Sequence, residues 1–135
     1  MTPTRLRNER GSVLVSGLLL SLALLMVIGA GVDLAHSFIV RRELASIADH
    51  AALTGAQQLD LNAVHEGRLA LDPERAREAA LAVLGTARVT AADAAATTGG
   101  VAVRVERSFD TVLLRLVGVT TVNVTATANA SPQTP

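Results

Sequence analysis

The sequence has no cysteine, tryptophan, tyrosine or lysine. Without cysteine there is no disulfide framework, no thiolate metal site and no cysteine nucleophile. Phe38 and Phe109 are the only aromatic residues, which leaves no platform on which bases or sugars could stack. The positive and negative side chains balance at 12 each, so no net charge attracts nucleic acid. We therefore expect no nucleic-acid partner.

Catalytic and metal-binding patterns are also missing. The three histidines, His36, His50 and His65, form no pair at the three- or four-residue spacing of zinc ligands. The sequence contains no Gly-x-Ser-x-Gly elbow, no phosphate-binding glycine loop and no clustered pair of carboxylates. The shortage of aromatic side chains also disfavours a small-molecule pocket. We expect no enzymatic activity, no metal, no cofactor and no small-molecule substrate.

An uncharged apolar stretch of 22 residues, Gly11 to Val32, lies near the start of the chain between Arg10 and Asp33. As a helix it would be about 33 Å long, which covers the roughly 30 Å hydrocarbon core of a bilayer. We therefore predict that residues 12–32 cross a membrane and that residues 1–11 form a short basic tail. The lipid bilayer is thus the first expected partner.

The charges that flank this stretch predict its orientation. The tail carries three arginines and the terminal amine, whereas Arg41 and Arg42 are the first arginines on the other side. The positive-inside rule then places the N-terminus in the cytoplasm and the rest of the chain outside the cytoplasmic membrane. Asp33 and His36 lie one helical turn apart at the outer edge. They could share a proton, or they could mark the point where the helix leaves the lipid.

A cleaved secretory signal peptide is the alternative interpretation of the same stretch. Such peptides have a 7 to 15-residue apolar region followed by a cleavage site between small residues, as in Gly29-Ala30-Gly31. The apolar run here is longer than that, and no helix-breaking residue follows it. These two features favour an uncleaved anchor.

The helical pattern continues beyond the membrane segment. From Asp33 to Gln58 there is no proline, and apolar residues recur at steps of three and four. We predict one continuous helix in which residues 33–60 form the extracytoplasmic part. Small side chains allow a second helix to approach closely, whether it belongs to the same domain or to a partner. We call the following residues the small-residue face: Ala45, Ala48, Ala52, Gly55 and Ala56.

Further along, capping residues predict a second helix. Asp72 is placed as its N-cap, Pro73 stands at the first helical position, and Gly85 follows the end. After it, residues 89–100 are rich in alanine and threonine. They indicate a loose strand or a loop, closed by a turn at Thr98-Gly99-Gly100.

Two valine-rich segments, residues 101–106 and 122–128, alternate apolar and polar side chains as half-buried strands do. The short apolar segment 109–117 lies between them, with Ser108 placed to cap a short helix there. A parallel crossover usually needs a dozen or more linking residues, so the two strands are predicted to pair as an antiparallel hairpin.

The predicted fold is therefore α+β. A long N-terminal transmembrane helix continues into an amphipathic helix, and a small domain follows at residues 61–130 with a second helix and a β-hairpin. Residues 131–135 contain two prolines and are expected to be a disordered tail.

Several motifs in the first half of the chain resemble a known family. Arg10-Gly11-Ser12-Val13 opens the apolar helix, Val32-Asp33-Leu34-Ala35 closes it, and Arg41-Arg42-Glu43-Leu44 follows. Residues 48–56 form an alanine-rich run around Asp49, which with Asp33 supplies the acidic positions of the motif. Taken together, residues 10–56 resemble the short TadE/TadG-like proteins of Tad (Flp) pilus assembly in bacteria. The final strand, which ends in Ala126-Thr127-Ala128, is also similar.

The resemblance implies a single-pass protein of the bacterial cell envelope that acts as a minor pilin or as an assembly component. Its partners would be other pilus-assembly or pilin-like subunits, bound through the long helix. In pilins a peptidase cuts after a glycine that precedes the apolar helix, and a glutamate five residues later serves assembly. Gly11 and Ser12 match the residues that flank this cut, whereas Ser16 stands in the place of the glutamate.

A different class of function also fits the anchor. The chain could be a signal-anchored or secreted envelope protein whose outer domain binds a ligand or regulates an enzyme. Neighbouring genes for a secretion ATPase and a short major pilin would favour the pilus interpretation.

Overall fold

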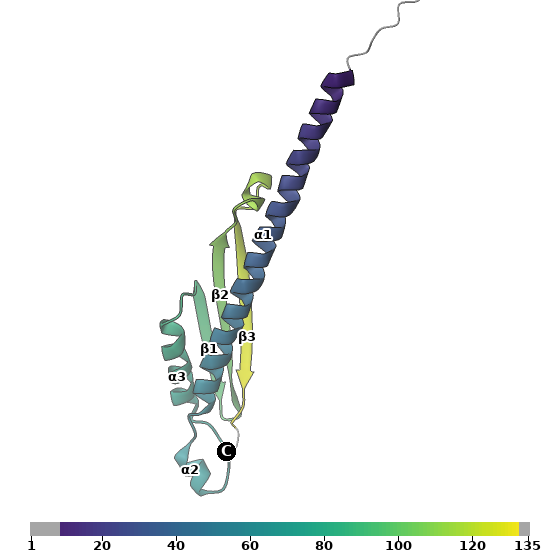
Figure 1. Cartoon of the computed structure of the whole chain (residues 1–135). Coiled ribbons are helices and arrows are strands. Elements are labelled where there is room, and N and C mark those ends of the chain that lie inside the picture. Colours follow the sequence, from purple (N-terminus) through teal and green to yellow (C-terminus); the bar gives the residue numbers. More distant parts are fainter. Residues whose placement is uncertain (1–8, 133–135) are drawn as a thin grey trace, which may run out of the picture.

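A computed structural model describes residues 9–132 of the chain. Most of the expected basic tail, residues 1–8, and the last part of the expected disordered tail, residues 133–135, lie outside the described residues. Helices and strands follow one another in an α+β arrangement (Figure 1). Their bounds are α1 Glu9–Ala56, α2 Leu61–His65, α3 Pro73–Gly85, β1 Ala91–Thr97, β2 Gly100–Asp110, the 3₁₀ turn η1 Leu114–Val117, and β3 Thr121–Ala130.

The long helix α1 is unbroken over 48 residues, because no proline interrupts it between Glu9 and Ala56. Its length is about 72 Å. The N-terminal part stands clear of the other elements, and the C-terminal part packs against them (Figure 1). The predicted continuation of the apolar helix beyond Asp33 is confirmed as far as Ala56, where α1 ends, so residues 57–60 lie outside the helix. Within the described residues, α1 is the one helix that is long and apolar enough to span a membrane.

The predicted second helix is also confirmed, as α3. The Asp72 side chain accepts a hydrogen bond of 3.2 Å from the backbone N–H of Arg75, and Pro73 occupies the first turn. Between α1 and α3, the connector forms a short helix that the sequence did not predict, α2, which begins at the N-cap Asp60.

The sheet has three antiparallel strands in the order β1-β2-β3, not the two strands of a hairpin. The predicted pair is present as β2 and β3, with Val103 opposite Ala128. The third strand, β1, is the alanine-rich segment that could have been a strand or a loop. It pairs along β2 from Ala91 opposite Glu106 to Thr97 opposite Gly100, and a two-residue turn closes the pair.

The short helix between the two predicted strands begins later than expected, and the proposed Ser108 cap is wrong. Strand β2 continues to Asp110, and the backbone N–H of Ser108 donates to the Thr90 hydroxyl at 3.0 Å. The turn η1 begins only at Leu114, and Gly118 ends it in the left-handed conformation at φ 92°. The N-cap position of η1 is Leu113, and its side chain makes no capping hydrogen bond.

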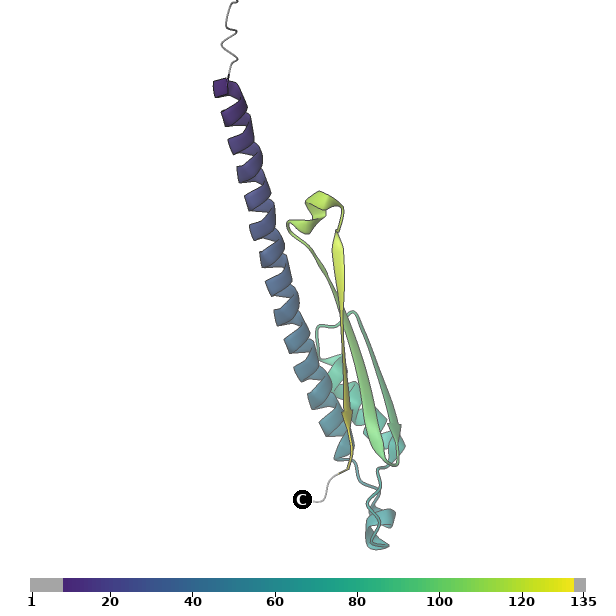
Figure 2. The ribbon, with the colours of Figure 1, turned by 90° about the vertical axis from the view of Figure 1, so that its right-hand side faces the viewer.

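The core lies between one face of the sheet and the two helices α1 and α3 (Figure 2). Alternate residues of each strand point into it, including Ala94, Val103 and Ala128, which lie next to one another across the three strands. From α1 the core receives Val40, Leu44, Ala48, Ala51 and Ala52, and from α3 it receives Ala76, Ala80 and Leu84. The domain is thus a two-layer structure whose helical layer is an extension of the apolar helix.

Candidate functional site

The small-residue face of α1 packs inside its own domain. Ala48, Ala52, Gly55 and Ala56 are buried, and Ala45 is half-buried. A Cβ atom added to Gly55 would lie 2.8 Å from the carbonyl oxygen of Ala76 on α3, so the two helices are in close contact here. Of the two alternatives that the sequence leaves open, packing within the domain is the arrangement that this fold uses. These positions are covered by α3 and the sheet.

The carboxylate of Asp33 joins α1 to the rest of the domain by hydrogen bonds. It accepts three backbone hydrogen bonds from the segment between β2 and β3: from Val112 at 3.1 Å and from Leu113 and Leu114 at 2.9 Å each. Asp33 therefore accepts from the first residue of η1, Leu114, and from the two residues before it, although about 80 residues separate it from this segment. The side chain is almost completely buried.

These hydrogen bonds also favour the ionised form of Asp33, which is the first residue after the predicted membrane segment. The N–H of Leu114 contributes most to holding the pKa of Asp33 below its ordinary value of 3.8, whereas burial acts in the opposite direction. The group is therefore ionised at neutral pH. A buried carboxylate is costly unless it is paired, and three N–H donors supply that pairing here.

Two further contacts join α1 to the same segment. A Cβ atom on Gly29 would overlap the side chain of Leu113, with 2.9 Å between the two Cβ positions, so the absence of a side chain at Gly29 makes room for this leucine. The ring of His36 meets the ring of Phe109 edge-on, with centroids 5.0 Å apart. Gly29, Asp33 and His36 lie along one side of α1 and hold the β2–β3 connection against the helix.

An ion pair between α1 and β2 lies further along the helix. Arg107 donates to both carboxylate oxygens of Glu43, at 2.8 and 3.2 Å, and its Nε donates to the carbonyl oxygen of Arg88 at 2.6 Å. These hydrogen bonds from Arg107 are the main reason that the pKa of Glu43 lies below its ordinary value of 4.5. Glu43 belongs to the motif Arg41-Arg42-Glu43-Leu44, and its neighbour Leu44 is fully buried in the core.

The other residues singled out from the sequence do not join these contacts. Asp49 is exposed on α1, one residue after the buried Ala48. Gly11 and Ser12 are exposed near the start of α1, where the helix stands apart from the domain. The structure therefore brings Asp33 to a contact site and leaves Asp49, Gly11 and Ser12 on the surface.

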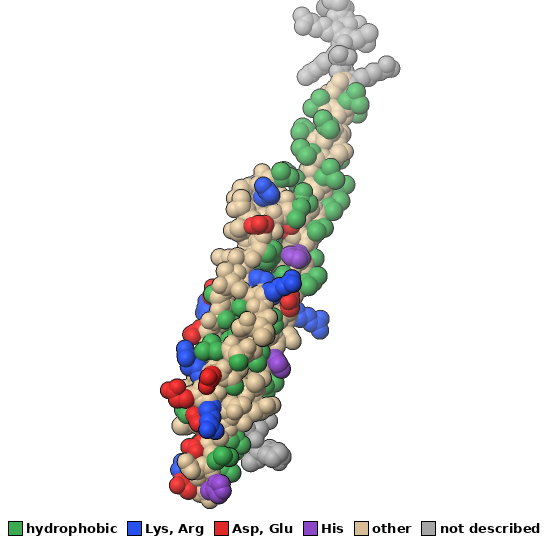
Figure 3. All heavy atoms as spheres, turned by 90° about the vertical axis from the view of Figure 1, so that its left-hand side faces the viewer, with side chains coloured by type: hydrophobic (Ala, Val, Ile, Leu, Met, Phe, Trp, Pro, Cys, Tyr) green, Lys and Arg blue, Asp and Glu red, His purple; other side chains and the backbone are tan. Residues whose placement is uncertain are grey.

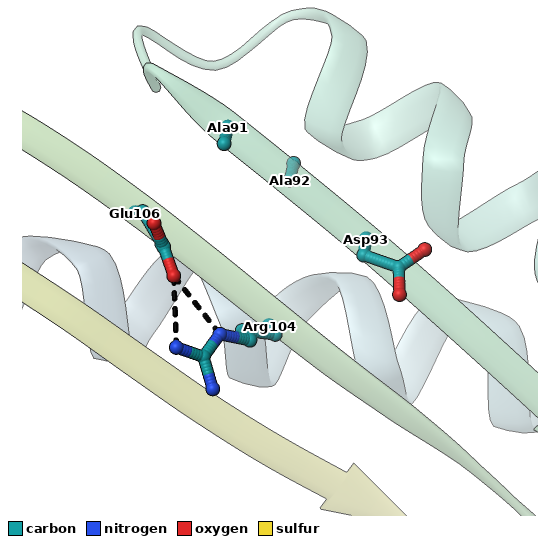
Figure 4. A pocket seen from close by; sticks show the side chains of 5 residues that line it. All are labelled: Ala91, Ala92, Asp93, Arg104 and Glu106. Carbon is teal, nitrogen blue, oxygen red and sulfur yellow. Dashed lines mark hydrogen bonds and ion pairs between the residues drawn. The ribbon is translucent and has the colours of Figure 1, made fainter.

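Two hollows in the described part of the surface are lined by charged side chains. On the open face of the sheet, Arg104 turns to Glu106 on its own strand, at 2.9 and 3.0 Å, while Asp93 points away from both (Figure 4). A larger groove of about 430 Å³ between α1 and α3 is open to solvent and is bordered by Glu43, His50 and Arg88. Among the residues that the structure describes, His, Asp and Glu form no group of three or more that could hold a metal ion.

The N-terminal part of the chain is similar to a known family. Residues 11–58 match the family model described as "Putative Flp pilus-assembly TadE/G-like". The matched segment contains α1 from Gly11 onward, including Gly29, Asp33, Glu43 and the small-residue face. No curated protein and no solved structure matches the chain.

Proposed function

We propose that this chain, whose residues 11–58 form a TadE/G-like domain of Flp pilus assembly, is a non-enzymatic minor pilin or assembly component of a Tad-type pilus or related secretion system. The family match carries this proposal, and the apolar helix α1 is consistent with a single-pass membrane anchor. The flanking arginines support a cytoplasmic N-terminus and a domain on the outer side of the membrane. The lipid bilayer and other Tad subunits are the proposed partners.

The exposed side of α1 supports packing against other subunits. Within the predicted membrane segment its leucines, valines and isoleucine lie on the surface, and hydrophobic side chains cover the helix on the face that Figure 3 shows, where it stands clear of the domain. Beyond Asp33, exposed apolar side chains continue at Leu34, Phe38 and Ile39. The small-residue face is covered by α3 and the sheet and is not free to bind a partner. We therefore propose that, outside the membrane, partner subunits contact the exposed residues Leu34, Phe38 and Ile39.

Deletion of the gene tests the proposed function. In the bacterium that carries it, loss of the chain should reduce the pilin recovered from the cell surface severalfold, since an assembly component is needed for fibre growth but not for pilin synthesis. Immunoblots of sheared surface material and of whole cells measure both quantities. The wild-type gene on a plasmid should restore the surface pilin. Equal amounts of surface pilin in parent and deletion strains would contradict the pilus role and favour a ligand-binding or regulatory envelope protein.

Processing of the N-terminus is a separate prediction. Gly11 and Ser12 occupy the positions that flank the cut in pilins, so we expect N-terminal sequencing of the membrane-extracted protein to start at Ser12. Gly11→Leu should then leave the N-terminus uncut, and Gly17→Leu, which changes a glycine six residues further on, serves as the control. A start at Met1 or Thr2 in the wild-type protein would mean an uncut anchor. A start at Val32 would instead indicate a cleaved signal peptide.

A further inference from the structure

The connection between β2 and β3 presents apolar side chains to the outside. Val112 is 71% exposed and Leu116 is 68% exposed, and Val119 is also on the surface. We infer that this connection, residues 112–119, inserts into the leaflet of the bilayer from which α1 emerges and forms a second membrane contact of the domain. The inference rests on the membrane anchor in the proposed function.

The position of the connection along α1 is fixed by the contacts already described. Leu113 covers Gly29, and Asp33 accepts from the N–H groups of Val112, Leu113 and Leu114. In both ribbon views the turn lies beside the middle of α1, at the end of the sheet nearest the N-terminal half of the helix (Figures 1 and 2). The connection therefore lies beside residues 29–33 of α1.

The level of residues 29–33 corresponds to the edge of the hydrocarbon core. The centre of the uncharged window from Gly11 to Val32 falls between residues 21 and 22. Along the helix axis, Gly29 lies about 11 Å from this centre and Asp33 about 17 Å. Half of the hydrocarbon thickness is about 15 Å. Leu113 thus lies within the apolar layer, and the exposed Val112 and Leu116 reach the boundary between acyl chains and headgroups.

The backbone of the connection suits this environment. A segment in contact with lipid must satisfy its polar groups within the protein. Asp33 takes the three N–H groups at the start of the turn, and carbonyl oxygens within the turn accept from Leu116, Gly118 and Val119 at 3.1 to 3.2 Å. At the base, the Thr111 hydroxyl donates to the carbonyl oxygens of Val119 and Thr120. The exposed Arg115 can extend its charged end to lipid phosphates.

Site-directed labelling can test the contact, because the chain has no cysteine of its own. Leu116→Cys in the full-length chain is labelled with a polarity-sensitive fluorophore and reconstituted in phosphatidylcholine–phosphatidylglycerol vesicles. We expect a blue-shifted emission, quenching by lipids that carry a nitroxide near the headgroup, and severalfold weaker quenching by aqueous iodide than at a control site. Leu61→Cys on α2 is the control, since it is a leucine of similar exposure, 64%, at the far end of the domain.

A third label, at Leu20→Cys inside the predicted membrane segment, tests separately whether α1 spans the membrane. If the Leu20 label is quenched by lipids that carry a nitroxide near the end of the acyl chain, but the Leu116 label responds only to iodide, the connection is in water and the inference is wrong. If the Leu116 label is shielded from both quenchers, another protein chain covers it, which also overturns the lipid contact. Iodide quenching at Leu20 would refute the membrane anchor itself.

Discussion

Replacing Ala52 with arginine should unfold the α+β domain, with a loss of more than about 4 kcal/mol in the free energy of unfolding. Ala52 is 1% exposed in the part of α1 that packs on the rest of the domain. An arginine there would need space that the close contact between α1 and α3 does not provide. Its guanidinium group would also be buried without an acidic partner, and a buried unpaired charge is among the most destabilising single changes.

The next residue along the helix supplies the control. Leu53 is 56% exposed, so Leu53→Arg has the same new side chain and should change the free energy of unfolding by less than about 0.5 kcal/mol. Urea unfolding of the full chain in detergent, followed by circular dichroism, measures both variants. Because α1 alone contributes helical signal, the loss of β-strand signal is the relevant readout. An Ala52→Arg variant as stable as wild type would mean that the small-residue face is not packed as described.

This pair of variants also separates a structural role of the small-residue face from a role in partner binding. If the Ala52→Arg protein is stable but no longer co-purifies with Tad subunits, the small-residue face binds a partner. If the variant loses the β-strand signal, the face packs inside its own domain. The close approach at Gly55, where a Cβ atom would come within 2.8 Å of the Ala76 carbonyl oxygen, is the reason we expect the second result.

The helices α1 and α3 could be predicted from sequence because their signals are local. An uncharged window of 22 residues and the absence of proline are visible in the chain itself, as are the Asp72-Pro73 start and the step of three or four between small residues. The strands β2 and β3 were also visible, since valine alternates with polar residues. In each case the residues that form the element carry its pattern.

Strand β1, which the sequence leaves open as a strand or a loop, and the start of η1 depend on distant partners. Strand β1 is mostly alanine, which has a low strand propensity, and it becomes a strand because the backbone of β2 offers hydrogen-bonding partners from Val101 to Glu106. The start of η1 is similar. The sequence predicts a cap close to the turn, at Ser108, whereas the N–H of Leu114, the first residue of η1, donates to Asp33 on another element.

The sequence indicates that Asp33 needs a partner. A carboxylate that directly follows 22 uncharged residues, with Leu34 and Ala35 after it, lies where an unpaired charge would be costly. Such a residue is expected to have a partner, and the nearest candidate in sequence, His36, turns instead to Phe109. The sequence therefore indicates that a partner exists, but the partner's identity depends on how the sheet folds back along the helix.

Replacing Asp33 with alanine should release the β2–β3 connection from α1 without unfolding the sheet. The three N–H groups of Val112, Leu113 and Leu114 would lose a charged acceptor. We expect their hydrogen exchange, measured by mass spectrometry or NMR on the full chain in detergent, to be at least roughly tenfold faster. The N–H groups of the β1–β2 ladder should exchange as in wild type, because this ladder is far from η1.

Asp49→Ala is the matched control, since it removes the other motif aspartate from an exposed position of the same helix. It should leave exchange in residues 112–114 unchanged. Asp33→Asn should be intermediate: the amide keeps one acceptor oxygen, but it turns an N–H₂ group toward at least one of the three donors. Unchanged exchange in Asp33→Ala would mean that packing of Leu113 on Gly29 alone holds the connection. Faster exchange confined to residues 112–114 would establish that a charge at the end of the apolar helix fixes where the domain lies along it.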